Sequence, residues 1–66
     1  MITLNQNWQD VMSLLPETGM GFHEVDVTLK GGRVHRGLFV YNCTYLKPGR
    51  ILFGNEDIAE IKMSKE

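Results

Sequence analysis

The sequence predicts a mainly β domain in which a short N-terminal helix precedes a five-stranded antiparallel sheet, strongly bent into a small open barrel. Three observations support this fold class. Apolar residues recur at helical spacing before Pro16, the period changes to two after Gly21, and turns containing glycine or proline divide the remainder into short strands. The chain has 66 residues, so residues 1–66 are expected to form one domain.

The helix is predicted at residues 5–15. Asn5 or Asn7 can cap its start, and Pro16 ends it, because the residue before a proline avoids helical geometry. A helix of this length is not stable alone, so its apolar stripe must dock against something. The stripe either covers the open core of this domain or binds a partner protein. Its members are Leu4, Trp8, Val11, Met12 and Leu15.

The first two strands are predicted at residues 22–30 and 33–41. The glycine pair at 31–32 is typical of a two-residue type I′ turn, in which both central residues have positive φ. Such a turn also sets which residues lie opposite one another in the hairpin. The expected pairs are Leu29 with Val34 and Val25 with Leu38.

Gly37 marks the place where the second strand is expected to bulge. The same register puts Arg36 opposite Val27, on the apolar face, so the strand must bend there. Glycine inside a strand often marks a bulge or a barrel corner. Beyond Gly37 both faces of the strand are apolar, which requires cover on both sides. The sheet covers one side, and the helix or a neighbouring subunit would cover the other.

Three shorter strands are predicted at residues 43–46, 50–53 and 58–63. Residues 47–50 have the Pro-Gly sequence of a type II turn. In a meander, successive turns alternate between the two ends of the sheet. We therefore expect the glycine pair and the Pro-Gly turn at one end, with Asn42 and the Gly54–Asn55 turn at the other.

Composition limits the ways in which so small a domain can be stabilised. Cys43 is the only cysteine, and His23 and His35 lack further ligands at zinc-site spacing, so we expect neither an internal disulfide nor a metal. A domain of this size is marginal alone, which favours a homo-oligomer. No apolar run approaches the length of a membrane span and no signal peptide is recognisable, so a cytoplasmic protein is expected.

Charge is unevenly distributed along the chain, although the net charge is only −1. Residues 27–55 contain no Asp or Glu. The basic residues in this segment either form one basic surface or occupy separate solvated positions. They are Lys30, Arg33, Arg36, Lys47 and Arg50.

No combination of residues indicates catalysis, so we expect neither an enzyme nor a cofactor. Cys43 is interpreted as a small core residue and the two histidines as ordinary strand residues. The acids at 56, 57 and 60 are interpreted as a solvated rim, not a catalytic pair. Three aromatic residues either stack bases or fill the core or a subunit interface, namely Phe39, Tyr41 and Tyr45.

The segment from Val25 to Gly37 resembles the first motif of the Sm and Sm-like (LSm) family. It has alternating aliphatic residues, a tight turn before Arg33 and a glycine in the bent second strand. The Gly54–Asn55 turn, with the isoleucines that follow it, is similar to the second motif of the family. The resemblance implies an Sm-like or SH3-like small barrel, assembly into a ring, and a pocket for single-stranded RNA.

By the same resemblance, the RNA pocket would contain Asn42, Tyr45, Gly54 and Asn55. The sequence departs from the family pattern in both motifs, and the aliphatic residue after Gly54 also comes one residue late. Asn42 arrives one residue early for the usual Asp, Leu46 stands where an Asn is usual, and Phe53 replaces a basic residue. The residues that hold the base are thus mostly replaced, so the barrel and its assembly are the stronger implications.

The basic residues suggest a second place for RNA, at the end of the first hairpin, formed by Lys30, Arg33, Lys47 and Arg50. Taken together, these features predict a non-catalytic binding and assembly module that acts as a homo-oligomer and binds single-stranded RNA at one of the two places. The alternative is a protein-interaction adaptor without a nucleic-acid role, whose barrel face or helix docks a partner protein.

Overall fold

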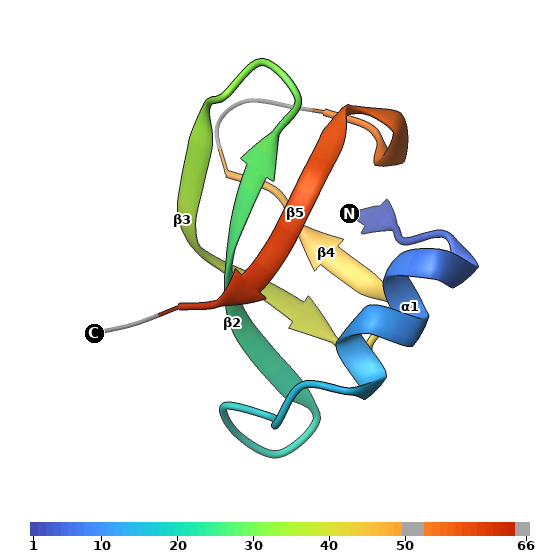
Figure 1. Cartoon of the computed structure of the whole chain (residues 1–66). Coiled ribbons are helices and arrows are strands. Elements are labelled where there is room, and N and C mark those ends of the chain that lie inside the picture. Colours follow the sequence, from blue (N-terminus) through green and yellow to red (C-terminus); the bar gives the residue numbers. More distant parts are fainter. Residues whose placement is uncertain (50–52, 65–66) are drawn as a thin grey trace.

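The chain folds into a short helix and a five-stranded antiparallel sheet that curls strongly into an open half-barrel (Figure 1). The computed structural model describes residues 1–49 and 53–64. The strands lie in the order β1-β4-β3-β2-β5, and the predicted mainly β fold with a short N-terminal helix is confirmed. The elements are β1 (Ile2–Thr3), α1 (Gln6–Ser13), β2 (Phe22–Leu29), β3 (Val34–Tyr41), β4 (Tyr45–Lys47), the 3-10 helix η1 (Asn55–Asp57) and β5 (Ile58–Met63).

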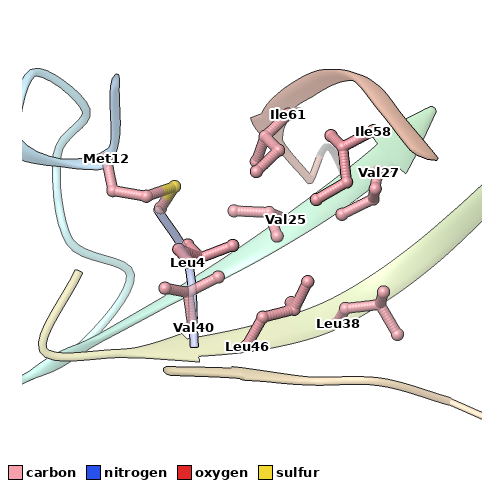
Figure 2. Packing of buried hydrophobic residues seen from close by; sticks show 9 residues of the cluster. All are labelled: Leu4, Met12, Val25, Val27, Leu38, Val40, Leu46, Ile58 and Ile61. Carbon is pink, nitrogen blue, oxygen red and sulfur yellow. The ribbon is translucent and has the colours of Figure 1, made fainter. Parts of the chain in front are cut away.

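The helix α1 is shorter than the predicted range 5–15. Asn5 caps its start, because the Asn5 side chain accepts a hydrogen bond from the backbone N–H of Trp8 at 3.1 Å. The helix ends at Ser13, with Leu14 as its C-cap, two residues before the proline. Met12 is fully buried beside Leu4 (Figure 2). The apolar stripe of the helix is therefore directed at the core of its own domain.

The core lies inside the curl of the sheet and contains nine buried apolar side chains of the described residues (Figure 2). Both long strands, β4, β5, the helix and the segment just before it contribute to the core. Removing these side chains from water is the main favourable term in folding. They are Leu4, Met12, Val25, Val27, Leu38, Val40, Leu46, Ile58 and Ile61.

The first hairpin pairs Val25 with Leu38, as predicted, but its turn differs from the predicted one. The N–H of Gly32 donates to the carbonyl of Leu29 at 2.8 Å, and Gly32, but not Gly31, has a positive φ. The turn is therefore not of the two-residue type I′ kind. Thr28, and not Leu29, lies opposite Val34, which consequently faces outward.

The predicted bulge at Gly37 is confirmed. The register passes from Val25 opposite Leu38 to Val27 opposite His35, so β3 has one residue more than β2 across this step. Gly37 has a φ of 69°, and its N–H donates to a carboxylate oxygen of Asp26 at 3.1 Å. The bulge also removes the conflict that a straight strand would create by placing Arg36 on the apolar face, because it turns the Arg36 side chain outward, where it is 79% exposed.

The remaining strands agree with the prediction in part. Asn42 and Cys43 both have positive φ and form a turn, so β4 begins at Tyr45 and not at residue 43. The predicted strand at 50–53 lies outside the described residues except for Phe53, which belongs to no strand. Of the predicted turn at 47–50, Lys47 belongs to β4 and only residue 50 lies outside the described residues. An unpredicted strand, β1, pairs with β4. The range of β5 is as predicted.

The prediction that Asn42 and the Gly54–Asn55 turn share one end of the sheet is wrong. β5 runs antiparallel to β2 with Ile58 beside Leu29, and the N–H of Lys30 donates to the carbonyl of Asp57 at 2.8 Å. The segment that precedes β5 therefore lies at the glycine-pair end of β2. Asn42 lies at the opposite end, where its N–H donates to the carbonyl of Gly21. Because β5 pairs with β2 and not with the strand before it in the chain, the turns do not alternate between the two ends of the sheet as they would in a simple meander.

Replacing Gly37 with valine is expected to cost about 1–3 kcal/mol of unfolding free energy, because a β-branched residue is strained at this positive φ. A Cβ at Gly37 would meet the Glu24 carboxylate at 3.5 Å, an ordinary contact, so backbone strain and not crowding causes the loss. Urea denaturation measures the change. Gly31→Val is the control, because φ is not positive there and nothing lies within 4 Å of an added Cβ. Equal stability of Gly37→Val and the parent would contradict this account.

Candidate functional site

Four aromatic side chains gather on the outer face of β2, β3 and β4, and we call them the aromatic patch. The register shows why they meet. Phe22, Tyr41 and Tyr45 are direct partners across the three strands, and direct partners point to the same side of a sheet. Phe39 lies two residues before Tyr41 and so points the same way. The patch therefore consists of Phe22, Phe39, Tyr41 and Tyr45.

Three of the four rings of the aromatic patch are in contact, and Tyr45 adjoins them as the strand partner of Tyr41. Phe39 packs edge-on against Phe22 at a centroid distance of 5.7 Å and stacks with Tyr41 at 6.4 Å. Gly19 approaches the ring of Phe22 so closely that a Cβ there would overlap it. Phe39 nevertheless remains 36% exposed and Tyr45 44% exposed. The patch is thus a preformed aromatic surface that solvent still reaches.

Charge beside the aromatic patch is balanced. Phe39 is the direct partner of Glu24 on one side and of Lys47 on the other, so one acid and one base flank the same ring. The next outward position of β2, Asp26, is only 4% exposed and is engaged with the Gly37 N–H and, at 4.0 Å, with Arg36. The surface around the rings therefore carries no marked excess of either sign.

The sequence showed that both faces of β3 beyond Gly37 are apolar, but not which face is covered. In the fold, Leu38 and Val40 point into the core, whereas Phe39 and Tyr41 point outward. The helix is directed at the core side through Met12. The second apolar face, for which the sequence required cover, is therefore the aromatic patch. Phe22 was missed as a member because its position at the strand start carries no pattern.

The four residues of the implied family pocket are not brought together. Asn55 uses its side chain for structure, since its oxygen accepts from the N–H of Asn5 and its amide donates to the carbonyl of Thr3, both at 2.9 Å. The N–H of Gly54 donates to the Asp57 carboxylate. Asn42 lies at the other end of β2, and Tyr45 belongs to the aromatic patch.

The basic end predicted from the sequence is also divided. Lys30 and Arg33 flank the glycine turn and, with Leu29, Gly31 and Asp57, line an open depression of about 380 Å³. Lys47 lies opposite Phe39, about 16 Å along β3 from the strand start beside this turn. Arg50 lies outside the described residues. An acid, Asp57, sits within the depression, so this end is not a purely basic surface.

The histidines have structural positions. His23 is buried, and its Nε2 lies 2.9 Å from the carbonyl of Leu15, which ties the end of the helix segment to β2. His35 lies on the face of Val27 and stacks on Phe53 at 5.5 Å. Cys43 is half-buried in the turn before β4 and packs against the core, so the interpretation of Cys43 as a small core residue holds in part. Among residues 1–49 and 53–64, no three His, Cys, Asp or Glu side chains converge as metal ligands would.

Asn55→Ala is expected to destabilise the fold by about 1 kcal/mol, because it removes both hydrogen bonds that join η1 to the N-terminal segment. Urea denaturation measures the loss. Asn7→Ala is the control, since Asn7 is exposed on α1 and alanine is the better helix former. A loss of RNA binding by Asn55→Ala without any loss of stability would instead restore the family pocket.

Comparison with known proteins adds no assignment. No protein-family model, no curated protein and no solved structure matches the chain. Within the described part of the chain, α1 is far shorter than a membrane-crossing helix and no other helix is long and apolar enough to cross.

Proposed function

We propose that this chain is a non-catalytic binding and assembly module that self-associates through the aromatic patch. The observation that carries the proposal is the set of four aromatic side chains on three adjacent strands, with the rings of three of these side chains in contact. Phe39 and Tyr45 are each more than a third exposed. Aromatic residues are enriched at the centres of protein interfaces, where large rigid side chains bury much area at little entropic cost. Contiguous apolar patches on a small monomer are otherwise an aggregation hazard.

The size of the domain supports the same proposal. A chain of 66 residues buries only about 60% of the surface that its unfolded form exposes, and self-association is one of the few remaining ways to add burial. The resemblance of Val25–Gly37 to the Sm-like family also points to assembly. A ring of that family uses strand edges, whereas the aromatic patch favours contact through a sheet face. The mass of the assembly distinguishes the two.

Binding of single-stranded RNA is the second candidate, and the observation in its favour is again the exposed rings. Aromatic side chains on a curved sheet are a common platform for stacking bases. The charges beside the rings weigh against it. Lys47 would attract phosphate, but Glu24 on the other side of Phe39 would repel it. Lys30 and Arg33, which line one depression, flank the glycine turn away from the rings.

The burial of Met12 weighs against the helix as the docking surface of the adaptor alternative. Because Met12 is buried in the domain's own core, the apolar stripe of α1 is not presented for a partner protein. An adaptor would therefore use the aromatic patch, in competition with a second copy of the chain. Capture of the chain as a stable monomer by a partner protein would favour this alternative over self-association.

Phe39→Ala is expected to shift a concentration-dependent oligomer toward monomer, because Phe39 is the central ring of the patch. Sedimentation across the micromolar range measures the mass. Val34→Ala is the matched control: it also shortens an exposed apolar side chain on β3, but next to the glycine turn. A parent protein that remains monomeric throughout, with a high melting temperature, would contradict the proposal.

For the RNA candidate, filter binding of single-stranded RNA across a salt series is the test. Tyr45→Ala should weaken binding at every salt concentration if bases stack on the patch, whereas Lys30→Glu with Arg33→Glu should weaken it and flatten its salt dependence if the glycine-turn end holds phosphates. Glu60→Ala, on exposed β5, is the control. Absent binding by the parent, or binding that is insensitive to salt, would reject an electrostatic RNA role.

A further inference from the structure

We propose that a second copy of this chain packs on the aromatic patch with a two-fold axis that runs along β3 past Phe39, so that Glu24 of each protomer faces Lys47 of the other. The inference rests on the proposed self-association and adds the partner's orientation. It follows from the order in which residues succeed one another across the outer face.

The central row of this face is Glu24, Phe39 and Lys47, in that order across β2, β3 and β4. The three strands are neighbours, so the acid and the base stand on opposite sides of the ring, with backbones about 10 Å apart. Both side chains belong to the edge of the patch, where interface rims carry their charges. The row is therefore polar at its two ends and aromatic at its centre.

Two sheet faces related by a two-fold axis can meet in two simple ways, because the axis must lie in the plane between them. An axis across the strands would set each residue of the row opposite its own copy, so that acid meets acid and base meets base. An axis along the strands reverses the row, so that each acid meets the base of the other protomer. Like charges that face each other are unfavourable, and the second arrangement alone avoids them.

The neighbouring row is compatible with the same axis. It consists of Phe22, Tyr41 and Tyr45 across the same three strands. Reversal of the row sets each Phe22 opposite Tyr45 of the partner subunit, while the two copies of Tyr41 meet near the axis. Rings then meet rings throughout. On the other side of the central row, Asp26 is held within its own chain by Gly37 and Arg36 and brings no free charge to the contact.

The test is a charge exchange followed by sedimentation of each protein over a concentration series. Glu24→Lys alone sets lysines opposite each other twice in the dimer, and Lys47→Glu alone does the same with glutamates. Each single variant should dimerise about tenfold more weakly than the parent at low salt, with the difference shrinking at high salt. The double variant should return to the parent's affinity. A mixture of the two single variants should form heterodimers in preference to homodimers.

Glu60→Lys is the control, because it makes the same change of charge at an exposed position on β5. Circular dichroism checks that each variant is folded. If Glu24→Lys does not fold, the comparison of Lys47→Glu with the parent is the test. A parent that dimerises, with single variants of unchanged affinity, would overturn the orientation and leave the proposed self-association standing. A parent that stays monomeric overturns both. If the parent is monomeric and Glu24→Lys binds single-stranded RNA more tightly than the parent does, the patch is a nucleic-acid surface and the proposed dimer is overturned.

Discussion

The hydrogen bond from the N–H of Gly37 to the Asp26 carboxylate holds the bulge on which the rest of the sheet depends. An extra residue in β3 leaves backbone groups without ladder partners, and an unsatisfied buried donor is costly. Asp26 supplies the acceptor at 3.1 Å while it is itself nearly buried. With this bond in place, His35 and Leu38 both lie on the core face of β3, although they are three residues apart. Arg36 is turned out to solvent by the same step.

The aromatic patch is a consequence of the register shift at this bulge. Beyond the bulge β3 alternates without interruption, so Leu38 and Val40 enter the core and Phe39 and Tyr41 leave it. The curl of the sheet and the docking of Met12 use the inner face only. Phe22 and Tyr45 join these rings from the adjoining strands, and the row of Phe22, Tyr41 and Tyr45 carries no charge. A fold stabilised on one face thus presents a cluster of aromatic side chains on the other.

Several polar residues that attract attention in the sequence serve the fold instead. The Asn55 side chain bonds the backbone on either side of Leu4, a fully buried residue, and so fastens the N-terminal segment over the core. The contact of Lys30 with Asp57 joins the glycine turn to the start of β5, and His23 joins the end of the helix segment to β2. Such residues satisfy backbone groups at places where strands end, which is why they resemble binding residues when seen in isolation.

The sequence by itself determined the features that near neighbours control. Alternation, a capping asparagine and a strand glycine were enough for β2, β3 and β5, the start of α1 and the bulge at Gly37, because each depends on local backbone preferences. The type of the Gly31–Gly32 turn, and with it the pairing of the residues beside the turn, was predicted wrongly, since several turn types accept the same residues. Only the tertiary structure decided that β1 exists, that β5 closes onto β2, and which apolar face of β3 remains open. These outcomes depend on contacts between residues far apart in the chain, and two residues of β1, or two equally apolar faces of one strand, carry no local pattern that could select them.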